Sequence, residues 1–292
     1  MKRAKKRRET LRIAVVGAGR LGTALTEYLS EAGYQITEIV TRDDLRSHAN
    51  GERLASKVGA KARTSSRAKL YADVVWFCVP DSQIATAAAA LSGHDWRKKL
   101  AFHSSGVLSS DALALLRERG ASVASLHPLM TFVNKSKPNL QGVPFAVEGD
   151  AAAIRIASCI IRDLGGNAFR IRKQNKFAYH AFAAMICPLL VSLLTASEKV
   201  ASLAGMSPRL ARRRMMPILN QTLANYAKLG PAASFSGPIV RGDAETIARH
   251  LAVLAKVPEV KRVYVGLALA AIRYLPTENV QAIQKALSRE ES

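Results

Sequence analysis

The sequence predicts an α/β protein in which a doubly wound, mostly parallel sheet is followed by an all-helical C-terminal domain. Three observations support this prediction. An apolar run at 12–16 leads directly into a Gly-x-Gly-x-x-Gly turn and a helix-periodic stretch. Strand and helix patterns then alternate up to about residue 172, which is typical of repeated β-α-β units. From Gln174 onward strand patterns nearly vanish, and only helical periodicity remains.

The glycine-rich turn predicts a dinucleotide site in a Rossmann sheet. It consists of Gly17, Ala18, Gly19, Arg20, Leu21 and Gly22. Gly17 allows the tight turn, Gly19 lets a pyrophosphate approach bare backbone, and Gly22 lets the helix pack close to the strand. The free N–H groups and the positive end of that helix then hold the diphosphate. The alternative is a glycine turn that binds no phosphate.

The end of the second predicted strand, at 35–40, indicates which dinucleotide is bound. NAD-specific sites usually carry an acid about 20 residues past the glycines, where it accepts hydrogen bonds from the ribose 2′-hydroxyl. This chain has Thr41 and Arg42 there, and the planar fork of an arginine pairs with a 2′-phosphate. Asp43 and Asp44 follow, and a strand that ended later would place one of these acids beside the ribose. The alternative for Arg42 is a solvated loop charge. We expect NADP(H) rather than NAD(H).

The residues that follow the later strands are expected to face ligands, because doubly wound sheets bind them beyond the C-terminal strand ends. Further strands are predicted at 72–79, 100–103, 122–126, 145–147 and 168–171, and helices at 82–91, 110–119 and 151–164. The residues assigned to cofactor contact are Val79, Pro80, Asp81, His103, Ser104 and Ser105. His127 closes another strand, either in a plain turn or as a site residue.

Three residues of the helical part are candidates for catalysis. His180 is the leading one, since an imidazole exchanges protons near neutral pH and His180 begins a long helix expected to face the nucleotide. Lys176 lies one turn earlier and would act in the same way or bind an anion. Arg241 would bind a substrate carboxylate, while Asp243 caps the next helix. The alternatives are a structural histidine at 180 and a loop at 237–243 that only caps the helix, and the sequence shows no metal-ligand cluster.

The 292 residues suffice for two domains, and the formal charge of +21 suits a small anionic substrate. We expect a basic disordered tail at 1–10, an NAD(P)-binding Rossmann domain at 11–172 and an all-helical substrate and dimerisation domain at 173–292. The tail lacks interleaved aromatic residues, so nucleic acid is not expected as a partner. Cys78, Cys159 and Cys187 show no Cys-x-x-Cys spacing, which favours buried free thiols in the cytoplasm.

The stretch 177–196 contains no Asp, Glu, Lys or Arg and is long enough to span a bilayer. It also holds Tyr179, His180 and a mid-run Pro188, and nothing else in the chain is typical of a membrane protein. A long helix buried between two subunits explains the same composition. We therefore expect a homodimer formed through the helical domain, and no membrane.

The chain resembles the bacterial Rossmann-like proteins with a C-terminal domain of unknown function 2520, from about Leu11 to its end. The motifs that carry the resemblance are 17–22, 79–81, 103–106, 125–128, 179–180 and 237–243. That family is similar in architecture to pyrroline-5-carboxylate reductase, ketopantoate reductase and coenzyme F420-dependent NADP reductase. The resemblance implies an NADP-linked oxidoreductase whose helical domain dimerises and completes the active site.

The chain departs from that pattern at Cys187-Pro188, where many relatives have Ser-Asn. An asparagine there would orient the substrate or the nicotinamide, whereas a proline removes a helix hydrogen bond and kinks the helix. Two hypotheses therefore stand. The first is an NADP-dependent reductase or dehydrogenase acting on a small carbonyl, imine or hydroxy acid. The second is a catalytically silent NADP-binding protein with a regulatory or interaction role.

Overall fold

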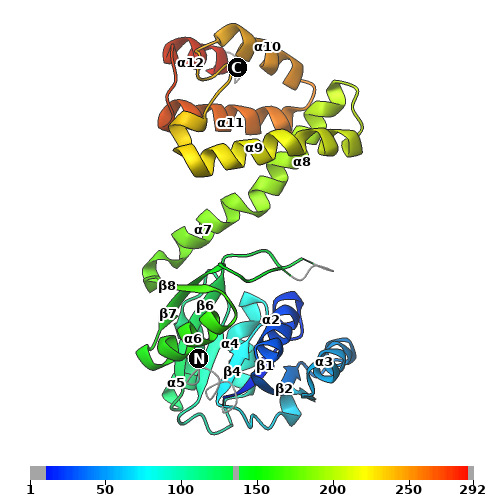
Figure 1. Ribbon diagram of the computed structural model, residues 1–292, viewed down its shortest axis with the longest axis vertical. Helices are drawn as coiled ribbons and strands as arrows, with labels where there is room; N and C mark the ends of the chain where they lie inside the picture. Colours follow the sequence, from blue (N-terminus) through cyan, green and yellow to red (C-terminus); the bar gives the residue numbers. More distant parts are fainter. Residues whose placement is uncertain (1–10, 134–137, 289–292) are drawn as a thin grey trace. The chain divides into compact units, whose positions relative to one another are not determined.

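The computed structural model describes residues 11–133 and 138–288 (Figure 1). The predicted basic tail at 1–10, and with it any contact to nucleic acid, lies outside the described residues. The chain divides into two compact units, Met1–Ala184 and Met185–Ser292.

The first unit is built on a sheet whose described strands have the order β3-β2-β1-β4-β5-β6-β7-β8. Their bounds are β1 (Arg12–Val16), β2 (Gln35–Thr41), β3 (Lys61–Thr64), β4 (Val74–Phe77), β5 (Leu100–His103), β6 (Ser122–Pro128), β7 (Pro144–Gly149) and β8 (Asn167–Arg170). Neighbouring strands are parallel except β6 and β7, which are antiparallel. The strand order reverses between β1 and β4, where doubly wound sheets bind their ligands.

Helices cover both faces of this sheet, because successive strand residues point to opposite sides. Ile13 and Val15 of β1 belong to one apolar cluster, together with residues of α2 (Arg20–Glu31), α3 (Leu45–Val58) and α6 (Ala151–Asp163). Ala14 and Val16 belong to the opposite cluster, with α4 (Asp81–Ala90) and α5 (Ala114–Glu118). The predicted fold class, a doubly wound Rossmann sheet followed by helices, is confirmed.

Two elements between β2 and β4 were missed by the sequence analysis. The helix α3 is largely polar and carries Gly51 in its interior, a residue that disfavours helices. The strand β3 has only four residues and no apolar run. Gly51 is needed for packing, since a Cβ there would lie 2.7 Å from Cγ2 of Thr41 on β2.

The second unit is helical throughout its regular structure in the described residues. Its helices are α8 (Pro188–Leu203), α9 (Pro208–Ser234), α10 (Ala244–Leu254), α11 (Pro258–Tyr274) and α12 (Val280–Ser288), and α7 (Lys176–Ile186) precedes them. The long helix predicted for the stretch 177–196 is interrupted at Cys187, next to the proline that was expected to kink it. Cys187 leaves the helical conformation (φ −124°, ψ −82°), and Pro188 starts α8 because its missing N–H costs nothing at a helix N-terminus.

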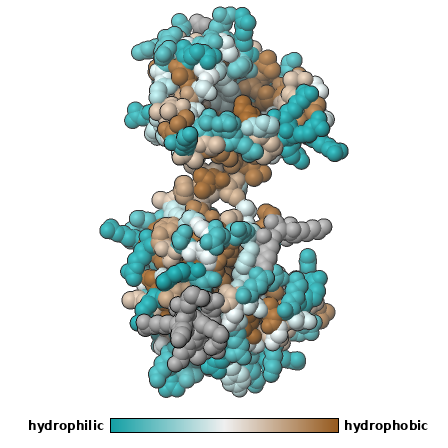
Figure 2. All heavy atoms as spheres, in the orientation of Figure 1, coloured by the Kyte–Doolittle hydropathy of each residue, from teal (hydrophilic) through white to brown (hydrophobic). Residues whose placement is uncertain are grey.

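The segment around α7 and α8 is strongly apolar. The stretch Lys173–Leu203 is long and apolar enough to cross a membrane, and it contains an 18-residue window with a mean hydropathy of 1.9, none of which is buried within the chain. Its exposed side chains include Phe177, Phe182, Met185 and Val191. Figure 2 shows hydrophobic residues, in brown, along α7. Such a surface is expected to be covered by something other than water.

Candidate functional site

The glycine turn joins β1 to α2 and leaves the start of the helix uncapped. Gly17 has a φ of 105°, and a Cβ at Gly22 would lie 2.0 Å from the Gly17 carbonyl oxygen, so both positions need glycine. A Cβ at Gly19 would meet nothing within 4 Å. No side chain caps α2, and no acidic residue lies in its first turn. The first N–H groups of α2 therefore have no side-chain cap, which suits an anion that approaches Gly19.

A cavity of about 480 Å³ lies at the C-terminal ends of β1, β2 and β4. Of the residues predicted to contact the cofactor, it brings together Gly17, Ala18, Gly19, Thr41, Arg42, Val79 and Pro80. Arg20, Leu21, Gly22 and Asp81 lie in the first turns of α2 and α4 but are not part of its lining. His103, Ser104 and Ser105, which follow β5, do not line it either.

The rim of this cavity at Arg42 is polar. The Arg42 guanidinium donates to Ser47 Oγ (3.2 Å) and lies 3.4 Å from Asp44. Asp44 caps α3 by accepting a hydrogen bond from the Ser47 N–H (2.8 Å), so this carboxylate is already engaged. Asp43 accepts hydrogen bonds from Ser65 and Ser66, which lower its pKa to about 2. Both carboxylates therefore already have hydrogen-bond partners within the protein.

The structure adds residues to this rim that the sequence analysis did not assign. They are Arg46, Ser47, Asn50 and Ser65, and they come from α3 and from the short helix η1 (Ser65–Arg67) after β3. Recognising the cap at Asp44 would have revealed α3 and placed these residues near Arg42. Two guanidinium groups beside two hydroxyls form a suitable environment for a phosphate group.

A buried lysine lies where α7 meets the ends of β5 and β6. Lys176 is 1% exposed, and its ammonium donates to the Ser105 carbonyl (3.1 Å) and to Ser125 Oγ (2.7 Å). Ser125 in turn donates to the same carbonyl (3.2 Å). Burial lowers the pKa of Lys176 to about 8, although Glu148 and Asp81 oppose the shift. An ammonium has three protons, and these two contacts leave one for a further acceptor.

A second polar pair lies next to Lys176. His127 Nδ1 is 2.8 Å from the Tyr179 hydroxyl, and the His127 ring is 6.2 Å from that of His180. Burial lowers the pKa of His127 to about 4, with further contributions from the charges of Lys176 and His180. Lys176, Tyr179 and His180 all lie within the first turns of α7, at spacings that place them on neighbouring parts of its surface.

The side chains of His103 and Ser104 are engaged inside the protein. His103 is fully buried, its Nδ1 accepts from the Ser105 N–H (3.2 Å), and its Nε2 donates to the Ser109 carbonyl (2.9 Å). Burial lowers its pKa to about 4. Ser104 Oγ accepts from the indole of Trp76 (2.9 Å). These contacts shape the loop that presents the Ser105 carbonyl to Lys176.

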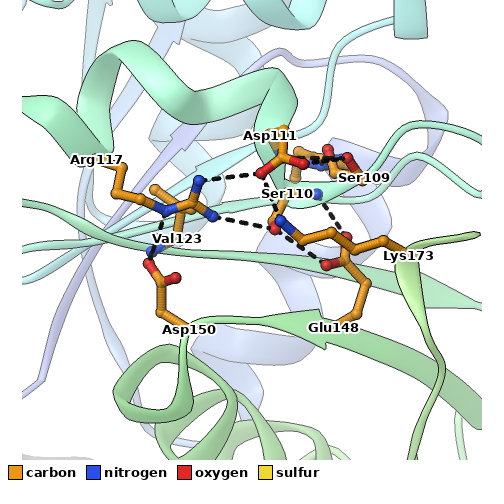
Figure 3. A network of polar contacts seen from close by, with 9 residues as sticks. Ser109, Ser110, Asp111, Arg117, Val123, Glu148, Asp150 and Lys173 are labelled. Carbon is orange, nitrogen blue, oxygen red and sulfur yellow. Dashed lines mark hydrogen bonds and ion pairs between the residues drawn. The ribbon is translucent and has the colours of Figure 1, made fainter.

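An ionic network anchors the chain just before α7 (Figure 3). Lys173, in the short helix η3 (Lys173–Asn175), contacts Asp111, which also accepts from Arg117 (3.0 Å). Arg117 continues to Asp150 (3.2 Å), whose carboxylate accepts from a backbone N–H of β6 (2.8 Å). The network joins β6 to the start of α7, and so it fixes the position from which Lys176 enters the site.

Arg241 belongs to the second unit, where it is exposed in the loop that precedes α10. Asp243 accepts a hydrogen bond from the Thr246 N–H (3.0 Å), which confirms it as the cap of α10. The described residues contain no group of three or more His, Cys, Asp or Glu side chains suited to a metal ion.

The cysteines are free, but not all are buried as predicted. Cys78 lies behind the glycine turn, and burial raises its pKa to about 12. Cys159 is partly exposed, and Cys187 is exposed at the break between α7 and α8. The expectation of three buried thiols is therefore wrong for Cys187.

The fold and the glycine turn define a Rossmann-like protein with a helical second part. Residues 2–128 match the family described as a Rossmann-like domain, and residues 143–271 match the domain of unknown function 2520. The chain thus combines a Rossmann-like domain with a C-terminal DUF2520 domain, and the resemblance seen in its motifs is confirmed. No curated protein matches the sequence.

Several solved structures share the fold along nearly the whole chain. BF3122 of Bacteroides fragilis, described as a candidate NADP oxidoreductase, is 21% identical, with a TM-score of 0.76 over 90% of this chain and 98% of its own. TM1727 of Thermotoga maritima is 26% identical, with a TM-score of 0.68 over 96% and 100%. An imine reductase of Myxococcus stipitatus, solved with NADP⁺, is 16% identical, with a TM-score of 0.66 over 96% and 100%.

Proposed function

We propose that this chain is an NADP(H)-dependent oxidoreductase that transfers a hydride between the nicotinamide and a small carbonyl, imine or hydroxy-acid substrate. One observation carries the proposal. The same edge of the sheet holds a dinucleotide-sized cavity, at the ends of β1, β2 and β4, and a buried lysine with a pKa of about 8, at the ends of β5 and β6. The descriptions of BF3122 and of the imine reductase add support, since both name NADP chemistry.

The residues around the cavity suit NADP(H). The open space before Gly19 and the uncapped start of α2 fit a diphosphate, while Arg42 and Arg46, with Ser47 and Ser65, fit a 2′-phosphate. NAD(H) is less suited, because Asp43 and Asp44 already accept hydrogen bonds within the protein. When bound, the cofactor supplies or accepts the hydride.

Lys176 and His180 are the two residues that we propose for proton transfer at the substrate. Ser105 and Ser125 hold the Lys176 ammonium, and its remaining proton is available to a substrate oxygen or nitrogen. A pKa of about 8 lets this group give and take a proton near physiological pH. His180, one turn later on α7, is the second candidate, and Arg241 of the second unit is proposed to bind a substrate carboxylate.

Calorimetry with NADPH and NADH, followed by a turnover screen, tests this function. We expect NADPH to bind more tightly than NADH, and bound NADPH to be oxidised by at least one member of a panel of keto acids, aldehydes and cyclic imines. Weak binding of both nucleotides would contradict the proposal. Tight NADPH binding without any turnover would instead favour the silent NADP-binding protein, for which the Cys187-Pro188 departure is the supporting observation.

We also propose that a second copy of the chain covers the apolar surface of α7 and α8. The exposed apolar side chains there are large and recur along both helices, and a homodimer would remove them from water. Light scattering should give twice the mass of one chain, and Phe182→Glu should shift the protein toward the mass of one chain. A wild-type protein that has the mass of a single chain, or that partitions into liposomes, would contradict this assembly.

A further inference from the structure

We propose that Tyr179 is a positioning residue that fixes the tautomer of His127, so that His127 is held as a neutral Nε2–H donor inside the Lys176 cluster. The assignment of that donor to substrate recognition rests on the proposed function. The tautomer itself does not, because it follows from contacts within the first unit.

The backbone places His127 beside Lys176. Ser125 and His127 are two apart on β6, so both side chains lie on the same face of that strand. Lys176 bonds to Ser125 and Tyr179 bonds to His127, which aligns the first turn of α7 with the end of β6. The two pairs are therefore neighbours on one strand and one helix.

The hydrogen bond between Tyr179 and His127 favours one direction of donation. A phenol is a good donor and a weak acceptor, whereas an unprotonated imidazole nitrogen is a strong acceptor. With the hydroxyl 2.8 Å from Nδ1, the phenol proton points to Nδ1 and the ring proton of His127 resides on Nε2. The two rings meet edge to face, with centroids 5.4 Å apart, so the imidazole is also held in orientation.

The Nε2 edge of His127 faces Gly106, which separates it from His180. A Cβ at Gly106 would lie 2.9 Å from Nε2 of His127 and 2.6 Å from Cδ2 of His180. Among the described residues none accepts a hydrogen bond from this Nε2. Because Gly106 has no side chain, the protonated edge of His127 lies next to the backbone of this glycine, and the two imidazoles approach each other with ring centroids 6.2 Å apart.

The surroundings keep both partners neutral. Burial, and after it the charges of Lys176 and His180, lower the pKa of His127 to about 4, so the ring does not take up a second proton near pH 7. Burial raises the pKa of Tyr179 to about 12, so the hydroxyl keeps the proton that it donates. A neutral donor suits a carbonyl oxygen or an imine nitrogen that becomes more basic during hydride transfer.

The test is nitrogen NMR of the full-length protein with ¹⁵N-labelled histidine, with the His127 signals assigned from their loss in His127→Gln. We expect protonated Nε2 and unprotonated Nδ1 at His127, unchanged between about pH 5 and 8. In Tyr179→Phe we expect a mixture of tautomers at His127. Wild-type protein with the proton on Nδ1, or a His127 spectrum unchanged in Tyr179→Phe, would overturn the proposal.

The chain offers a matched control in a second Tyr–His pair. Tyr264 lies 3.0 Å from His250 Nδ1, with ring centroids 5.9 Å apart, in the second unit. Tyr264→Phe should leave the His127 signals as in wild type, which excludes a general effect of losing a tyrosine hydroxyl. Calorimetry of the wild-type protein with NADPH separates the two ideas, since absent binding contradicts the proposed function while the tautomer measurement stands.

Discussion

The nucleotide cavity and the Lys176 cluster lie at one edge of the same sheet but are built in opposite ways. The cavity is lined at its phosphate end by consecutive backbone groups, with Gly17 and Gly22 leaving no room for a Cβ. The cluster is assembled from side chains on β6, α7 and the loop after β5, and Lys176 is almost fully buried. A cavity lined by backbone should lose its ligand when a side chain is added to it. A cluster of side chains should lose its activity when one of their polar groups is removed.

The largest expected effect is that of Gly22→Ala. The new Cβ would lie 2.0 Å from the Gly17 carbonyl, which the turn cannot accommodate without moving. We expect NADPH binding to be lost and the free energy of unfolding to fall by about 1–3 kcal/mol, the range for overpacking. Calorimetry and urea denaturation measure the two effects.

Gly93→Ala is the control for that substitution, because a Cβ at Gly93 meets nothing within 4 Å. It should leave NADPH affinity and the urea midpoint close to wild type. An unchanged NADPH affinity in Gly22→Ala would show that the turn does not hold the cofactor.

Removing a proton carrier from the cluster should affect turnover and spare binding. His180→Ala is expected to lower turnover roughly a hundredfold, the usual scale for general acid–base catalysis. NADPH affinity should stay within a few-fold, because His180 does not line the nucleotide cavity. Steady-state kinetics and calorimetry test this, with His94→Ala as the control; undiminished turnover would leave Lys176 as the remaining candidate.

Substitution of Arg42 should change the affinities for NADPH and NADH by the most unequal amounts. Arg42→Ala removes the proposed charged partner of the 2′-phosphate, and such a hydrogen bond contributes about 1.5–3 kcal/mol, or roughly 10- to 100-fold in affinity. NADH affinity should change little. Arg97→Ala, which removes an exposed arginine paired with Asp95 outside the cavity, is the control. Equal losses for NADPH and NADH would mean that Arg42 does not recognise the 2′-phosphate.

The difference between the nucleotide cavity and the Lys176 cluster also explains what the sequence could predict. The glycine turn and Arg42 follow a strand within a few residues, so local patterns were enough to place them. The contacts Lys176–Ser125 and His127–Tyr179 join residues 51 and 52 positions apart, and only the packing of α7 on β6 brings them together. Arg46 and Ser47 were missed for another reason: the helix α3 has few apolar residues and carries Gly51 in its interior, so its sequence is not typical of a helix.

The last effect we expect is on the pH dependence of stability, and it reports directly on the buried ammonium of Lys176. The pKa of Lys176 is about 8 in the folded protein and near its ordinary value of 10.5 in the unfolded chain. Between these values the unfolded chain binds more protons, so the free energy of unfolding rises with pH, by at most about 1.4 kcal/mol per pH unit.

Lys176→Met should remove this component. The difference between wild type and variant in urea denaturation should therefore grow in favour of wild type from about pH 8 to pH 10. Measurements stop there, because Tyr179, with its pKa raised to about 12, gives the opposite slope once unfolded tyrosines ionise. Lys228→Met, at an exposed site on α9, is the control and should show no such slope. Parallel curves for wild type and Lys176→Met would mean that Lys176 titrates as it does in water, and Lys176 would then lose its role as the tuned proton carrier of the cluster.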